Sequence, residues 1–91
     1  MRFLRSFHET FQSAVDYYAG IDTKLARRFI YAVEEAQSKI VKFPKIGRRI
    51  ANGREFLLEV FPYGFCYLED SEGEPLAVRL FHYRQKGPEI R

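Results

Sequence analysis

Three apolar, aromatic-rich runs in the C-terminal half constrain this chain more than any other feature. They cover residues 54–61, residues 63–69 and a stretch from Pro75 to Arg84. Pro62 separates the first two, because proline has no N–H with which to continue a strand ladder. The acidic, glycine-containing stretch 69–74 separates the second from the third. Short runs joined by tight turns pair with their neighbours, so the sequence predicts an antiparallel three-stranded meander.

Two amphipathic helices are predicted ahead of the meander. Ser6 and Glu9 have the spacing of a capping box, and the first helix should run from there to about Ala19. Asp22 is predicted to cap the second helix, and Pro44 to end it. The connection is short, so the helices should form an antiparallel hairpin. Residues 2–6 predict a short first strand, and residues 44–53 predict a loop.

Length and composition indicate one α+β domain over residues 1–91, of which 46% are hydrophobic. No apolar run approaches the roughly 20 residues that span a bilayer. The N-terminus lacks the long apolar region of a signal peptide, so we expect a cytoplasmic protein without membrane contact. The single cysteine, Cys66, is interpreted as a small core residue.

The predicted strands carry more apolar side chains than one sheet face needs. Two helices can cover only one face, yet apolar residues occupy both. We interpret one set as an exposed patch that binds a partner protein, consisting of Leu57, Phe61, Phe65 and Tyr67. The alternative is a strongly twisted sheet that covers its own edge residues. A patch of this kind would also favour a homodimer when no partner is present.

Basic residues gather in two places, although the net charge is only +3. The stretch 45–54 contains no acid, and the C-terminal tail adds further cations. We predict a target-binding set of Arg48, Arg49, Arg54, Arg84 and Lys86. If the chain cleaves RNA, its catalytic residues would be His82, Arg84 and Arg54, since arginines stabilise a phosphorane and an imidazole serves as acid or base. The alternative is a solvated basic rim. The two histidines and one cysteine lack the spacing of metal ligands, so we expect no metal and no cofactor.

Seven short fragments, taken in order, resemble the RelE/ParE superfamily of type II toxin–antitoxin toxins over nearly the whole chain. They are Phe7-His8-Glu9, Asp16-Tyr17-Tyr18, Ala26-Arg27-Arg28-Phe29, Phe43-Pro44-x-x-Gly47, Arg54-x-Phe56-Leu57-Leu58, Phe61-Pro62-Tyr63-Gly64 and His82-x-Arg84. The resemblance implies a helical hairpin packed on an antiparallel sheet of the three C-terminal strands, joined by the first strand beside the last.

The resemblance also implies a growth inhibitor that a bound antitoxin neutralises. RelE-type members cut mRNA on the ribosome with a set of basic residues, of which only Arg84 clearly matches here. Phe65 stands where a third-strand arginine is expected, and Ile90 where a terminal aromatic is expected. The chain therefore looks closer to the ParE branch, whose target is DNA gyrase. The alternatives are a ribosome-dependent mRNA interferase and an inactive, toxin-derived binding module.

Overall fold

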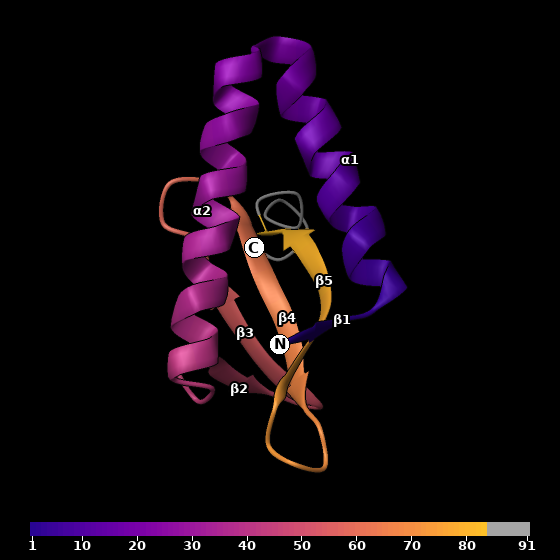
Figure 1. Ribbon diagram of the computed structural model, residues 1–91, viewed down its shortest axis with the longest axis vertical. Helices are drawn as coiled ribbons and strands as arrows, with labels where there is room; N and C mark the ends of the chain where they lie inside the picture. The colour runs from indigo at the N-terminus through magenta and orange to yellow at the C-terminus, as the bar shows by residue number, and fades with distance from the viewer. Residues whose placement is uncertain (84–91) are drawn as a thin grey trace, which may run out of the picture.

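A computed structural model of the chain shows two helices packed on one face of a five-stranded sheet (Figure 1). The structure describes residues 1–83. Its elements are β1 (Arg2–Phe3), α1 (Arg5–Ile21), α2 (Thr23–Lys42), β2 (Arg48–Ile50), β3 (Gly53–Leu57), β4 (Tyr63–Glu69) and β5 (Pro75–His82). The strand order is β1-β5-β4-β3-β2. β1 runs parallel to β5, and every other pair is antiparallel. The expected α+β architecture is confirmed, including the N-terminal strand beside the last one.

The stretch 44–53 is more ordered than the sequence predicts. Residues Arg48–Ile50 form β2, which pairs with β3 through a turn at Ala51 and Asn52. The prediction of a loop is therefore wrong for these three residues. Their composition hides the strand, because only Ile50 is apolar and two arginines give no alternating pattern.

The two helix starts follow different rules. Asp22 caps α2 as predicted, since its Oδ1 accepts the backbone N–H of Lys24 at 3.0 Å. Ser6 caps nothing, because α1 begins at Arg5 and its N-cap residue, Leu4, makes no side-chain cap. Instead the Ser6 hydroxyl donates to the carbonyl of Val78 at 2.6 Å. Thr10 Oγ1 accepts the N–H of Leu80 at 2.9 Å, so two hydroxyls tie α1 to β5.

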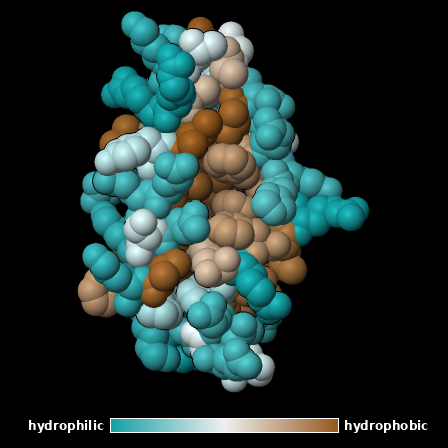
Figure 2. Space-filling model, in the orientation of Figure 1, coloured by the Kyte–Doolittle hydropathy of each residue, from teal (hydrophilic) through white to brown (hydrophobic). Residues whose placement is uncertain are grey.

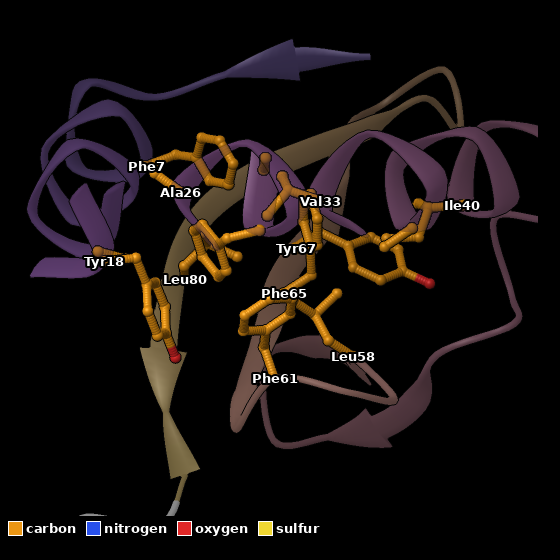
Figure 3. Packing of buried hydrophobic residues seen from close by; sticks show 14 residues of the cluster. Phe7, Tyr18, Ala26, Val33, Ile40, Leu58, Phe61, Phe65, Tyr67 and Leu80 are labelled. Carbon is orange, nitrogen blue, oxygen red and sulfur yellow. The ribbon is translucent and has the colours of Figure 1, made fainter. Parts of the chain in front are cut away.

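The core lies between α2, α1 and the inner face of the sheet (Figure 3). The buried stripe of α2 consists of Ala26, Phe29, Val33, Ala36 and Ile40, at the predicted spacing of three or four residues. Phe65 and Tyr67 of β4 meet this stripe, and both are fully buried. Burying each such side chain contributes roughly 1.5–3 kcal/mol, which makes β4 the best-anchored strand of the sheet.

The predicted exposed patch is wrong for three of its four residues. Leu57 is 45% exposed, but Phe61 is 7% exposed and Phe65 and Tyr67 are 0% exposed. Phe65 pairs with Phe56 on the helix-covered face, whereas Leu57 pairs with Gly64 and points to the other face. The strand predicted over 54–61 ends at Leu57, and Phe61 packs in the core after that end.

Candidate functional site

The β2–β3 hairpin carries the three described arginines of the predicted target-binding set, Arg48, Arg49 and Arg54, and places the last two side by side. In the strand register, Arg49 pairs with Arg54 and Arg48 pairs with Glu55. Neighbouring residues of a strand point to opposite faces, so Arg48 emerges on the helix-free face and Arg49 on the other. The remaining members, Arg84 and Lys86, lie outside the described residues.

A pocket of about 250 Å³ opens beside this hairpin. Its polar lining consists of Lys45, Arg49, Asn52, Arg54 and Glu69. Three cations therefore face one carboxylate, which suits the pocket to a carboxylate or phosphate of a binding partner. We name this set the hairpin pocket. The sequence reasoning missed Lys45 and Asn52 as site residues, although both belong to the acid-free stretch 45–54 that could have indicated them.

The three arginines differ in how far they are already engaged. Arg54 has a side chain only 14% exposed, and its guanidinium donates to the carbonyl of Gly47 at 2.9 Å. Its Nε also lies 3.8 Å from a Glu69 carboxylate oxygen. Arg48 forms an ion pair with Glu55. Arg49 is exposed and has no ion pair or side-chain hydrogen bond among the described residues. Arg54 is thus largely structural, whereas Arg49 is left without an ion pair among the described residues.

His82 lies at the opposite end of β4, against Tyr63. The two rings meet edge to face with centroids 4.9 Å apart. The Nδ1 atom of His82 is buried without a hydrogen-bond partner among residues 1–83. Burial raises the pKa of Tyr63 and of its neighbour Tyr18, and nearby phenols raise both further. Both phenols are therefore protonated at neutral pH.

The structure does not bring Arg54 and His82 together. Arg54 pairs with Tyr67, and His82 pairs with Tyr63, four positions away on β4. At about 3.3 Å per residue this separation is roughly 13 Å along the strand. The fully buried Phe65 stands between them on the same face. The third predicted catalytic residue, Arg84, lies outside the described part of the chain.

A groove follows α2 on the side of residues 56–61. Two adjoining hollows of about 190 Å³ and 380 Å³ form it, and they share Ala32, Glu35 and Val60. Val60 is 77% exposed and Tyr31, on α2, is 62% exposed. Leu57 lines the first hollow and Phe61 borders the second. We name this surface the α2 groove, and it keeps two of the four predicted antitoxin-binding residues together.

The α2 groove also carries charge. Arg27 and Arg28 line its second hollow. Neither forms an ion pair within the part of the chain that the structure describes. Glu35 hydrogen-bonds Tyr31 and raises the pKa of that phenol. Figure 2 shows a second apolar surface, a band of hydrophobic side chains between α1 and α2. Apolar segments with acidic residues therefore find matching surfaces on both sides of α2.

Two further properties bear on function. Within residues 1–83 no group of three or more histidine, cysteine, aspartate or glutamate side chains is placed to hold a metal ion. No helix in this same range is long and apolar enough to cross a membrane.

No protein-family model matches the chain, and no curated protein matches it either. Its function is therefore inferred from its own residues and fold.

Proposed function

We propose that this chain is the toxin of a type II toxin–antitoxin pair, of the RelE/ParE superfamily and closer to its ParE branch. Its activity is to bind a protein target in the cytoplasm, with DNA gyrase as the first candidate. Two observations support the assignment to this superfamily. The helical hairpin, the C-terminal meander and the first strand beside the last form the topology that the resemblance implies. One motif also falls at an element boundary, because Phe43 ends α2 and Pro44 and Gly47 lie in the loop that follows it.

The separation of Arg54 from His82 is the observation that favours a binding toxin over a nuclease. Cleavage of RNA without a metal needs its acid, base and phosphate-binding groups within hydrogen-bond reach of one scissile bond. Arg54 and His82 instead flank the buried Phe65 from opposite ends of β4. Arg54 is moreover committed to the carbonyl of Gly47.

The target-binding surface of the proposed toxin is the hairpin pocket. Arg49 is exposed there without a partner among the described residues, and Lys45 is held only by a 3.9 Å ion pair to Glu69. An acidic side chain from the target can displace Glu69 from these cations at small cost, because exposed ion pairs contribute only about 0–1 kcal/mol. We expect the target to present a carboxylate cluster to this pocket.

The antitoxin in this proposal occupies the α2 groove. A segment that is disordered alone would fold there as a helix, with apolar side chains between Tyr31 and Val60. Its acidic residues would meet Arg27 and Arg28 at the end of the groove. Leu57 and Phe61 keep their predicted role as parts of the antitoxin surface, Leu57 as an exposed contact and Phe61 as part of the floor.

The test is to induce the chain without antitoxin in a bacterial host. Filamentation with DNA damage, together with inhibition of purified gyrase in a supercoiling assay, is the expected outcome. Rapid translation arrest with cleaved mRNA would replace this proposal by the ribosome-dependent mRNA interferase. Normal growth with intact mRNA and unaffected gyrase would indicate an inactive, toxin-derived binding module.

The mRNA interferase stays as the second candidate because of one feature of His82. Its Nδ1 is buried and unpartnered beside Tyr63, within residues 1–83. An imidazole is the side chain that most often serves as acid or base, and this one has a ring nitrogen that its own residues leave unpaired within the described range. If the chain cleaves mRNA, the variant His82→Gln should stop cleavage while the chain stays folded. The same variant should leave gyrase inhibition unchanged if the first proposal is correct.

A further inference from the structure

The helix-free face of the sheet carries an ordered row of side chains centred on Cys66. Cys66 lies in the middle of β4, which is also the central strand of the sheet. Glu55 pairs with it from β3 on one side, and Arg79 pairs with it from β5 on the other. All three side chains point to the same face, because directly paired residues of neighbouring strands share a face. Both helices lie on the opposite face (Figure 1).

Apolar side chains flank this row along the strands. Leu57 leans over Gly64 on one side, as shown by its Cδ2, which lies 2.8 Å from where a Gly64 Cβ would be. Leu68 leans over Gly53 on the other side in the same way, at 2.6 Å. Leu57 is 45% exposed. The face therefore has an apolar row, a charged row with a thiol at its centre, and a second apolar row.

The charges in the central row have opposite signs at equal distances from Cys66. Glu55 is one strand away on one side and Arg79 one strand away on the other. Arg79 is exposed and forms no ion pair within residues 1–83. Its guanidinium carbon lies 5.4 Å from the ring centroid of Phe81, which holds it over the sheet. Glu55, whose side chain is 17% exposed, also forms an ion pair with the exposed Arg48 of its own chain.

We propose that this face is the interface of a homodimer, in which two sheets stack around a two-fold axis parallel to β4. This axis places β3 of each subunit against β5 of the other. Glu55 then faces Arg79 of the partner subunit, twice by symmetry, and the two Cys66 side chains face each other at the centre. Leu76, which pairs with Leu68 on this face, comes to lie over Gly53 of the partner subunit, where it meets the Leu68 side chain that covers this glycine. The interface does not rest on the proposed function.

The pattern of charges favours this axis over a two-fold axis perpendicular to the strands. An axis perpendicular to the strands would stack Glu55 on Glu55 of the partner subunit, and Arg79 on Arg79 of the partner subunit. Like charges placed directly opposite each other across an interface strongly disfavour association. The homodimer that the sequence suggested through Leu57, Phe61, Phe65 and Tyr67 thus moves to the helix-free face, where Leu57 alone of the four remains exposed.

The size of the face sets the expected strength of the dimer. Five strands spaced about 4.8 Å apart, with an average length of about five residues, give a face of roughly 24 by 17 Å. Two such faces with side-chain relief bury an area near the roughly 1,000 Å² at which stable interfaces begin. We therefore expect a reversible dimer whose population depends on protein concentration.

The first measurement uses the unmodified chain. Cys66 is its only cysteine, so a short bismaleimide can join two chains only through this residue. Facing sheets lie about 10 Å apart, which such a reagent spans. We expect a crosslinked dimer whose yield follows the dimer fraction in sedimentation equilibrium. A chain that stays monomeric at all concentrations, or a dimer that Cys66 fails to crosslink, would overturn the interface.

The second measurement reverses the charges. Glu55→Lys and Arg79→Glu should each weaken the dimer by about tenfold or more, since each places like charges opposite each other. An equimolar mixture of the two variants should restore the dimer as a heterodimer, in which both charge pairs are again opposite. Lys24→Glu, at the exposed start of α2, is the matched control and should leave the dimer unchanged. Failure of the mixture to restore dimerisation, with both variants shown folded by circular dichroism, would contradict the proposed axis.

Discussion

The phenol oxygen of Tyr67 lies 3.0 Å from the amide nitrogen of Gly47, so a fully buried side chain of the central strand holds the loop after α2. The same hydroxyl donates to the carbonyl of Pro44 at 2.7 Å. Arg54 donates to the Gly47 carbonyl from the other side. These bonds position the loop that carries Lys45 and leads into β2. The hairpin pocket is therefore fixed by the core.

The variant Tyr67→Phe tests this connection. It keeps the buried ring but leaves the Gly47 N–H and the Pro44 carbonyl without their partner. An unsatisfied buried polar group costs about 1–3 kcal/mol, so the free energy of unfolding should fall by that amount in a urea titration. Tyr17→Phe is the matched control, because Tyr17 is 61% exposed and should change stability little. Equal stabilities for the two variants would contradict the structural role of the Tyr67 hydroxyl.

Two glycines should respond in opposite directions to substitution by alanine. A Cβ at Gly47 would lie 2.7 Å from the Tyr67 hydroxyl and 2.9 Å from the backbone oxygen of Glu55. Gly47→Ala should therefore lower the free energy of unfolding by about 1–3 kcal/mol through overpacking. A Cβ at Gly20, in α1, meets nothing within 4 Å, so Gly20→Ala should raise it by up to about 1 kcal/mol. Thermal unfolding of the two variants measures both changes in stability, the decrease for Gly47→Ala and the increase for Gly20→Ala.

Sequence reasoning was most successful where one local rule acts alone. Asp22 has a single effective partner, the first turn of the helix that follows it, and its capping was predicted correctly. Ser6 had two possible partners, the first turn of α1 and the neighbouring strand. Its hydroxyl donates to the carbonyl of Val78 of β5, 72 positions away in the chain. A capping box cannot be told from such a long-range bond without knowing which strand lies beside the helix.

The sheet faces were harder to predict, because alternation shows which residues share a face and not which face the helices cover. Leu57 and Phe65 both belong to apolar runs, yet they point to opposite faces. The closeness of Arg49 and Arg54 was predictable, since they are near each other in the sequence, but Arg48 points to the opposite face of the sheet. The separation of Arg54 from His82 could not be predicted, because it depends on the strand register. Arg54 pairs with Tyr67, whereas His82 pairs with Tyr63.

Asp70 should make the turn between β4 and β5 sensitive to acid. Its carboxylate accepts the backbone N–H groups of Glu74 and Glu72, and these bonds, together with the charge of Arg2, lower its pKa. A lowered pKa stabilises the fold above the ordinary aspartate value of about 3.9, and this stabilisation disappears as the pH falls through the lower, folded value.

The variant Asp70→Asn isolates this contribution. An amide oxygen still accepts hydrogen bonds, but it does not titrate, so the variant should lose less stability than the original chain when the pH drops below about 4. The readout is the difference in Tm between neutral and acid solution for each chain. Identical differences would mean that Asp70 titrates in the folded chain as it does in the unfolded one.

Arg49 and Arg54 should separate binding from stability, although they pair with each other across β2 and β3. Arg49 is exposed and unpaired among the described residues, so Arg49→Ala should change the free energy of unfolding by no more than about 0.5 kcal/mol. Arg54→Ala removes a charged donor from the carbonyl of Gly47, which should cost about 1.5–3 kcal/mol. Urea denaturation measures both.

The same two variants test the hairpin pocket as the target-binding surface. Arg49→Ala should abolish growth inhibition on induction while the chain stays folded and abundant. Arg5→Ala, which removes an exposed arginine from the start of α1, should remain fully toxic and serves as the control for loss of one positive charge. Full toxicity of Arg49→Ala would exclude Arg49 from target binding. Loss of toxicity in Arg54→Ala must be read together with the measured stability of this variant. Losing the Arg54–Gly47 hydrogen bond can disturb the loop on which the pocket is built.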